Sequence, residues 1–128
     1  MKILVFGLPG SGKTTFAKKL VEGKKIPHFN ADQIRELFCD WDFTTNGRNR
    51  QANRMLAMCD FVVNNVVIDF VCPYENFRKL FNITVYMNTI NKSRFEDTNK
   101  VFQLPKRPTY EIKDFNYDDV LKELRSKL

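Results

Sequence analysis

The sequence contains few cysteines and a single histidine, and these low counts bear on disulfide bonds, zinc binding and histidine-based catalysis. Its three cysteines, Cys39, Cys59 and Cys72, are odd in number and show no Cys-x-x-Cys spacing. This pattern argues against a disulfide framework or a zinc site and favours the reducing cytoplasm. A lone histidine beside a predicted strand is more often structural than catalytic, so His28 is assigned no role.

Long hydrophobic runs, internal repeats and low-complexity tracts are also missing. No apolar run approaches the length of a membrane span, so no membrane partner is expected. A chain of 128 residues suffices for one modest domain, and an apolar content of 43% argues against disorder. The net charge of +6 suits an anionic substrate, although it is also compatible with nucleic acid or with a merely soluble basic surface.

One segment near the N-terminus fits a phosphate-binding loop at every required position. The apolar run before it, residues 2–6, predicts a buried strand, and residues 14–23 place Phe16 and Leu20 at helical spacing. In this context backbone N–H groups and a helix N-terminus hold phosphate. Lys13 would reach the terminal phosphates of ATP, and Thr14 would offer its hydroxyl to Mg²⁺. The predicted ATP-binding residues of the loop are Gly7, Leu8, Pro9, Gly10, Ser11, Gly12, Lys13, Thr14 and Thr15.

The rest of the chain alternates strand and helix patterns. Further strands are predicted at residues 24–30, 64–71, 82–88 and 109–115. Helices are predicted at 31–38 and 51–63, in a short segment after Pro73, and at 116–128 with Asn116 as the cap. Residues 39–50 are expected to form a loop and residues 89–108 a mobile segment. This order predicts a single domain over 1–128 with a three-layer α/β/α phosphate-loop NTPase fold and a central, mainly parallel sheet of about five strands.

A carboxylate and a guanidinium follow the second predicted strand. Ligands of parallel sheets bind beyond the carboxyl ends of the strands, so Asp32 is expected near the nucleotide. It would orient an acceptor hydroxyl and accept its proton, which makes Asp32 and Lys13 the predicted catalytic residues. Arg35 would grip an anion on the acceptor, and the alternative is a surface ion pair with Asp32. Asp69 ends another strand and is either a ligand of the metal or a structural hydrogen-bond acceptor.

The segments NADQIR, DFTTNGRNRQANRM, DFVCPYENFR and RFEDTNKVF, taken in order with the phosphate loop, resemble adenylylsulfate kinase along nearly the whole chain. That family phosphorylates the 3′-hydroxyl of adenosine 5′-phosphosulfate with Mg-ATP, which here implies a role in sulfate activation. The resemblance also implies a short lid within residues 91–104 and leaves a homodimer open. The sequence departs from the family where Asn30 and Ala31 replace an acidic residue and a glycine.

The same resemblance assigns roles to residues in the loops and the lid. Phe43 and Phe102 would stack on the two sides of the acceptor's adenine, with core packing as the alternative for both rings. Arg94 in the lid would contact ATP. Arg50 would bind the acceptor, with Arg48 as its competitor. The full set of substrate-binding residues that the resemblance implies is Asp32, Arg35, Phe43, Arg50, Asn53 and Phe102.

Two other functions remain alternatives. A polynucleotide 5′-hydroxyl kinase or another small-nucleotide kinase would also couple a phosphate loop to an Asp-x-x-Arg segment. No helix carries the cluster of basic residues that nucleic acid would favour. A nucleotide-binding switch without chemistry is the alternative of another class. The replacement at Asn30 supports it, whereas the presence of Asp32 argues for catalysis.

Overall fold

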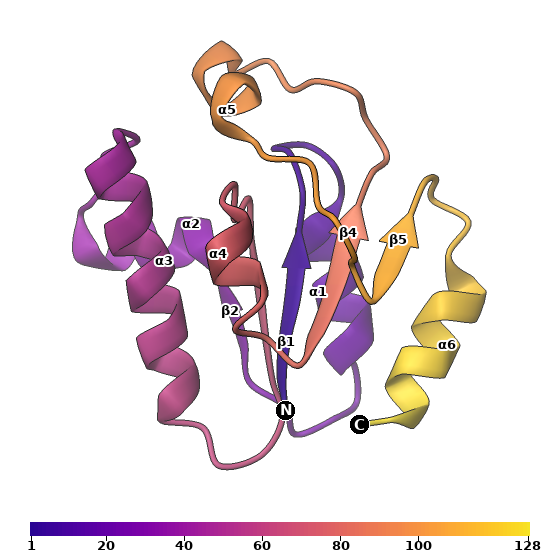
Figure 1. The fold of residues 1–128 in the computed structure, drawn as a ribbon. Coiled ribbons are helices and arrows are strands. Elements are labelled where there is room, and N and C mark those ends of the chain that lie inside the picture. The colour runs from indigo at the N-terminus through magenta and orange to yellow at the C-terminus, as the bar shows by residue number, and fades with distance from the viewer.

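A five-stranded sheet forms the centre of the molecule, and all of its neighbouring strands are parallel (Figure 1). The computed structural model describes residues 1–128. The strands lie in the order β2-β3-β1-β4-β5, which confirms the predicted fold class. Their bounds are β1 (Lys2–Phe6), β2 (His28–Asn30), β3 (Val66–Phe70), β4 (Ile83–Met87) and β5 (Tyr110–Ile112).

Helices cover both faces of the sheet. One face packs against α1 (Lys13–Val21) and α6 (Asp118–Ser126), and the other packs against α2 (Ala31–Phe38), α3 (Thr45–Asp60) and α4 (Glu75–Arg78). Figure 1 shows the remaining helix, α5 (Glu96–Val101), above the carboxyl ends of the strands. None of these helices combines the length and the apolar character needed to cross a membrane.

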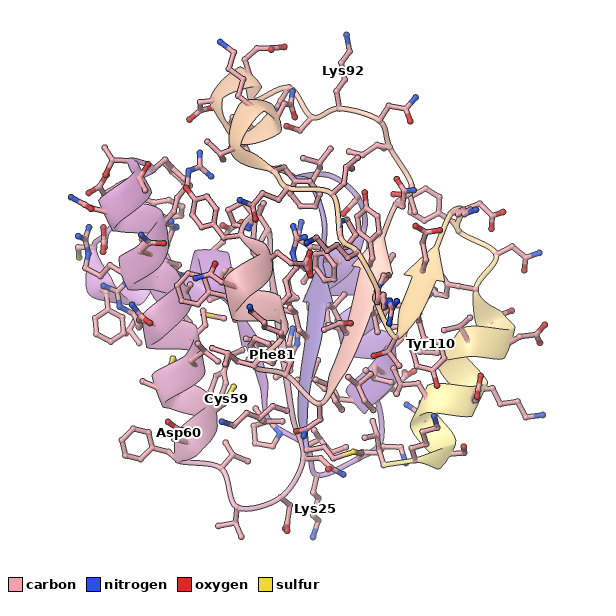
Figure 2. The ribbon with its side chains drawn as sticks, viewed as in Figure 1. Lys25, Cys59, Asp60, Phe81, Lys92 and Tyr110 are labelled. Carbon is pink, nitrogen blue, oxygen red and sulfur yellow. The ribbon has the colours of Figure 1, made fainter.

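The two faces of the sheet explain why the central strands are apolar throughout. Ile3 and Val5 of β1 join the hydrophobic layer under α1 and α6, whereas Leu4 and Phe6 join the layer under α3 and α4. Cys59, labelled in Figure 2, lies in this second layer. A parallel sheet buries both faces, so its strands lack the alternation of a half-exposed sheet.

The loop predicted at residues 39–50 is shorter than expected. Helix α3 already begins at Thr45, because the Thr44 hydroxyl oxygen caps it by accepting a hydrogen bond from the Gly47 N–H at 3.2 Å. Gly47 lies so close to Asp42 that an added Cβ would stand 2.2 Å from the Asp42 carbonyl oxygen. The prediction of a loop over 45–50 was therefore wrong. It followed from the sequence Thr-Thr-Asn-Gly, whose residues are typical of a turn.

Two other local expectations also differ from the structure. Asn116 does not cap α6, because Tyr117 holds the cap position and the Asn116 N–H donates to the Asp114 carboxylate at 2.8 Å. The segment predicted to be mobile, residues 89–108, contains α5. A hydrogen bond from Ser93 Oγ to Asn99 Oδ1, at 2.7 Å, connects the residues before α5 to the helix itself. Its mobility stays a prediction.

Candidate active site

A cleft of about 850 Å³ opens at the carboxyl ends of the strands. The phosphate loop after β1 forms its floor, and the ends of β2 and β3 and the start of α2 form its inner side. The loop between α2 and α3 lines another side, and the segment that carries α5 lies above it (Figure 1). Segments distant in sequence therefore meet where ligands of parallel α/β sheets bind.

The phosphate loop leaves the N-terminus of α1 free for an anion. No side chain caps α1, and its first turn contains no acidic residue. The cap residue is Gly12, whose φ of 90° favours glycine, and a Cβ there would lie 2.9 Å from the Phe115 ring. Ser11 Oγ is buried without a hydrogen-bond partner beneath the loop. Free backbone N–H groups at a helix N-terminus suit a phosphate chain.

Lys13 lies folded over the loop, where its Nζ donates a hydrogen bond to the Leu8 carbonyl oxygen at 3.0 Å. Burial lowers the pKa of Lys13 to about 8, and the attraction of Asp69 and Asp32 offsets only part of this effect. The ammonium thus lacks a counter-charge strong enough to hold its normal pKa. A phosphate group would supply one.

A hydrogen-bonded cluster joins the phosphate loop to the ends of β2 and β3. Asp69 Oδ1 accepts from Thr14 Oγ1 and from Asn30 Nδ2, each at 3.0 Å. His28 Nε2 pairs with the other oxygen, Asp69 Oδ2. Asn30 and Asp69 are partners in the parallel register, so the single carboxylate of this pair comes from β3 rather than from β2. Asn30 Oδ1 also caps α2 through the Gln33 N–H at 3.0 Å.

No pattern in the sequence indicated the contact between His28 and Asp69. The two residues are far apart along the chain, and only the pairing of β2 with β3 brings them together. His28, which was assigned no role from the sequence, thus binds the carboxylate of Asp69. For Asp69, this pairing supports the alternative of a structural hydrogen-bond acceptor. Asp69 also lines the cleft, so its carboxylate remains available to a metal there.

Asp32 and Arg35 both line the cleft, but they do not form the surface ion pair that was their alternative. Asp32 is exposed. Arg35 is buried, and its Nη1 donates to the carbonyl oxygens of Asp40 at 2.9 Å and Asp42 at 3.1 Å. Its guanidinium carbon stands 4.3 Å from the centre of the Phe43 ring. These contacts occupy Nη1 and leave the Nε and Nη2 edge of Arg35 without a protein partner.

Of the two competing arginines, Arg48 lines the cleft and Arg50 does not. Arg48 is buried, and its Nε donates to the Phe43 carbonyl oxygen at 2.8 Å. Its Nη2 reaches α5, where it donates to Thr98 Oγ1 at 3.1 Å. Arg50 points instead toward the α2–α3 loop and binds Asp40, with Nε 2.7 Å from Oδ2. The expectation of Arg50 at the acceptor differs from this placement, because two residues of a helix that are two positions apart point about 200° apart, and α3 turns Arg48 toward the cleft.

The aromatic residues of the cleft differ in part from the predicted pair. Phe43 lines the cleft with its ring 44% exposed, as expected. Phe102 lies outside the lining and stacks on the core rings of Phe6 and Tyr86, at centroid distances of 6.5 and 6.0 Å. Phe95, 45% exposed, is the aromatic residue that the α5 segment places in the lining. Core packing, the alternative for Phe102, is what the structure shows.

The remaining predicted residues divide between the cleft and the surface. Arg94 lines the cleft, with its guanidinium carbon 5.1 Å from the centre of the Phe95 ring. Thr15 lines it at the start of α1. Asn53 lies exposed on α3, outside the lining. The cleft thus brings together both ends of the predicted site. Its lining lacks Arg50, Asn53 and Phe102 at the acceptor end, and Gly7, Leu8 and Ser11 of the phosphate loop.

Solved structures share this fold at low sequence identity. The chain is similar to the Mycobacterium tuberculosis APS kinase CysC in complex with AMPPNP and APS, with a TM-score of 0.77 and 18% identity over 98% of this chain and 95% of that one. A shikimate kinase from Aquifex aeolicus gives a TM-score of 0.69 and 16% identity over 99% and 95% of the two chains. A gluconokinase from Sinorhizobium meliloti gives 0.66 and 14% over 98% and 89%. These likenesses establish the fold.

Sequence comparison identifies the family to which the chain belongs. An adenylate kinase from Lachnoclostridium phytofermentans is 53% identical over 34 residues, which is 27% of this chain and only 16% of that protein's length. The model of the adenylylsulphate kinase family matches residues 1–105. This match spans the phosphate loop, α2, the three arginines of the cleft and α5. The chain therefore belongs to the adenylylsulphate kinase family, a family of phosphotransferases.

Proposed function

We propose that this chain transfers a phosphoryl group from Mg-ATP to a hydroxyl group of a small anionic acceptor, with adenosine 5′-phosphosulfate as the first candidate. The supporting observation is that a single cleft contains both an uncapped helix N-terminus, suited to phosphate, and a separate end lined by side chains, suited to an acceptor. Asp32, two buried arginines and two exposed phenylalanine rings line that acceptor end. Membership of the adenylylsulphate kinase family supports the choice of acceptor.

At the donor end, the chain's own groups suit a triphosphate. The backbone N–H groups of the phosphate loop and the N-terminus of α1 would hold the phosphates, and Lys13 would balance their charge. Lys13 needs only to leave the Leu8 carbonyl oxygen to do so. Once bound to the phosphates, the Lys13 ammonium would stabilise the negative charge that develops on the leaving phosphates in the transition state. Arg94 would approach the donor from the segment above.

Mg²⁺ fits the oxygen atoms beside the loop. Thr14 Oγ1 and Asp69 Oδ1 lie 3.0 Å apart, and hydroxyl and carboxylate oxygens are ligands that Mg²⁺ accepts. The chain contains no cluster of three or more His, Cys, Asp or Glu side chains arranged for a metal. Mg²⁺ commonly binds through one or two protein oxygens together with substrate phosphates, so this sparse set suits it. The metal would neutralise phosphate charge.

At the acceptor end, each group has a part in positioning. Asp32 makes no ion pair with Arg35 and stays free to orient the acceptor hydroxyl and to accept its proton. The free Nε and Nη2 edge of Arg35 suits an oxyanion held by two parallel hydrogen bonds. Phe43 and Phe95 would stack on a planar base, as Phe43 and Phe102 were expected to do. Residues 91–104 would act as the lid that shields the transfer from water.

The proposal is tested by ADP release with Mg-ATP and one acceptor at a time. The acceptors are adenosine 5′-phosphosulfate, shikimate, gluconate, nucleoside monophosphates and a 5′-hydroxyl oligonucleotide. We expect the highest kcat/KM with adenosine 5′-phosphosulfate and no transfer by the Lys13→Ala variant. Preference for the oligonucleotide would establish the polynucleotide kinase instead. ATP binding without transfer to any acceptor would establish the nucleotide-binding switch.

A further inference from the structure

The loop between α2 and α3, residues 39–44, contributes two aromatic residues to the acceptor end and holds one of its arginines. Phe43 and Trp41 come from this loop, and both line the cleft. The carbonyl oxygens of Asp40 and Asp42, which hold Arg35, come from it as well. The loop has no regular secondary structure, so side-chain contacts must hold its shape.

Asp40 is the centre of those contacts. Its Oδ2 accepts from Arg50 Nε at 2.7 Å and from Arg54 Nη2 at 2.9 Å. Its Oδ1 accepts from Arg50 Nη2 at 3.0 Å and from the Asp42 N–H at 3.3 Å. These two arginines hold the pKa of the Asp40 carboxyl well below its usual range, so the carboxylate stays charged across the physiological range. Asp40 does not line the cleft.

Both arginines come from helix α3. Arg50 and Arg54 stand four residues apart on α3, so they share one face of that helix. Arg50 also binds the second carboxylate of the loop, with Nη2 3.1 Å from Asp42 Oδ2. The close approach of Gly47 to Asp42 seats the end of the loop directly on the first turn of α3. The loop is therefore tied to α3 by charge as well as by packing.

The backbone of the same loop residues holds Arg35, which lines the cleft. The Asp40 carboxylate binds α3, while its carbonyl oxygen accepts from Arg35 Nη1 at 2.9 Å. Arg35 Nη1 can be shared by the Asp40 and Asp42 carbonyls only while the loop keeps this shape. That shared contact leaves the Nε and Nη2 edge of Arg35 without a protein partner, and the guanidinium carbon stands 4.3 Å from the centre of the Phe43 ring.

We propose that Asp40 is a positioning residue of the acceptor site. Its carboxylate, gripped by Arg50 and Arg54, fixes the 39–44 loop so that Arg35 and Phe43 are in place before the acceptor binds. Arg50 then acts through the loop rather than by touching the acceptor. The kinetic part of this inference rests on the proposed function, whereas its structural part does not.

The structural part has a direct reporter, because Trp41 is the only tryptophan of the chain and lies inside the loop. The Asp40→Asn variant keeps the shape of the side chain and removes its charge. We expect acrylamide to quench Trp41 fluorescence more strongly and the fluorescence anisotropy to fall, while the far-ultraviolet circular dichroism stays the same. Unchanged quenching in Asp40→Asn would overturn the proposal.

Asp60→Asn is the matched control. Asp60 pairs with Lys2 at the opposite end of α3 from the cleft, as Figure 2 shows for its position on that helix. The substitution removes the same charge from an aspartate of an exposed ion pair with a single lysine, and we expect neither Trp41 fluorescence nor kinetics to change. An equal effect of both substitutions would mean a general response to lost charge and would also overturn the proposal.

The kinetic part depends on separating the two substrates. With Asp40→Asn we expect the acceptor KM to rise roughly tenfold, while the ATP KM and kcat at saturating acceptor stay within about twofold. Asp40→Glu keeps the charge and should recover part of the loss. Equal changes in both KM values and kcat would mean a merely structural role.

Comparison with Arg50→Gln distinguishes positioning from direct contact. If Arg50 itself bound the acceptor, Asp40→Asn would release it and lower the acceptor KM. If Asp40 acts through the loop, both substitutions raise this KM, and the double variant is no worse than the more affected single variant. Arg50 is half-exposed, so Arg50→Gln also serves if Asp40→Asn does not fold.

If the parent protein phosphorylates no acceptor, the proposed function fails while the fluorescence of Trp41 still decides the role of Asp40.

Discussion

Nucleotide binding should draw a proton onto Lys13. Burial lowers the pKa of this ammonium to about 8 in the free protein, so about half of the molecules carry a neutral Lys13 at pH 8. Bound phosphates beside Nζ favour the charged form and raise the pKa again. Binding should therefore take up about half a proton at pH 8 and about a tenth of a proton at pH 7.

The same pKa has a consequence for stability, and its sign follows from proton counting. Between pH 8 and the unfolded value of 10.5 the unfolded chain binds more protons at Lys13 than the folded protein does. The contribution of Lys13 to the free energy of unfolding therefore rises with pH across this window. Below pH 8 the buried charge costs about 3 kcal/mol, and bound phosphate would relieve this cost.

Titration calorimetry with a non-hydrolysable ATP analogue measures the proton uptake. Titrations at pH 7 and pH 8 in two buffers of different ionisation enthalpy give the number of protons at each pH. Phosphate monoesters ionise near pH 6, so the nucleotide itself contributes little at pH 8. The Lys13→Met variant is the control and should take up no proton. Equal uptake at both pH values, or uptake by the variant, would refute the reasoning.

Three further predictions concern the acceptor site and the core. Asp32→Asn should lower kcat roughly 10²–10⁴-fold with little change in acceptor KM, and near-normal turnover in steady-state assays would remove Asp32 from the mechanism. Phe95→Ala should raise the acceptor KM and leave the melting temperature nearly unchanged, whereas Phe102→Ala should lower the free energy of unfolding by about 2–3 kcal/mol and leave both KM values alone. A reversed pattern would return Phe102 to the acceptor site. Met55→Ala should lower the free energy of unfolding, measured by urea denaturation, by about 2–5 kcal/mol, because Met55 of α3 is fully buried, and a loss below 1 kcal/mol would contradict that packing.

The sequence by itself determined the features that depend on neighbouring residues. The phosphate loop needs its glycines, Lys13 and Thr14 at set spacings, and the strand before it and the helix after it complete a local unit. The alternation of apolar strands with helices was enough to predict a parallel sheet with both faces covered. Asp32 could be placed at the carboxyl end of β2 because its position follows directly from where that strand ends.

Tertiary structure alone decided which side chains face the cleft. Helix α3 begins at Thr45, six residues before the predicted start, so Arg48 and Arg50 both lie on it. Successive residues of a helix point about 100° apart, so these two arginines lie on nearly opposite sides of α3 and only one of them can face the cleft. Phe95 and Phe102 lie at the two ends of α5, and only packing on Phe6 and Tyr86 sends Phe102 to the core. The contact between His28 and Asp69 needs β2 beside β3, and the binding of Asp40 by Arg50 and Arg54 needs the loop folded back on α3. These choices depend on contacts between segments far apart in the chain, for which local sequence patterns contain no information.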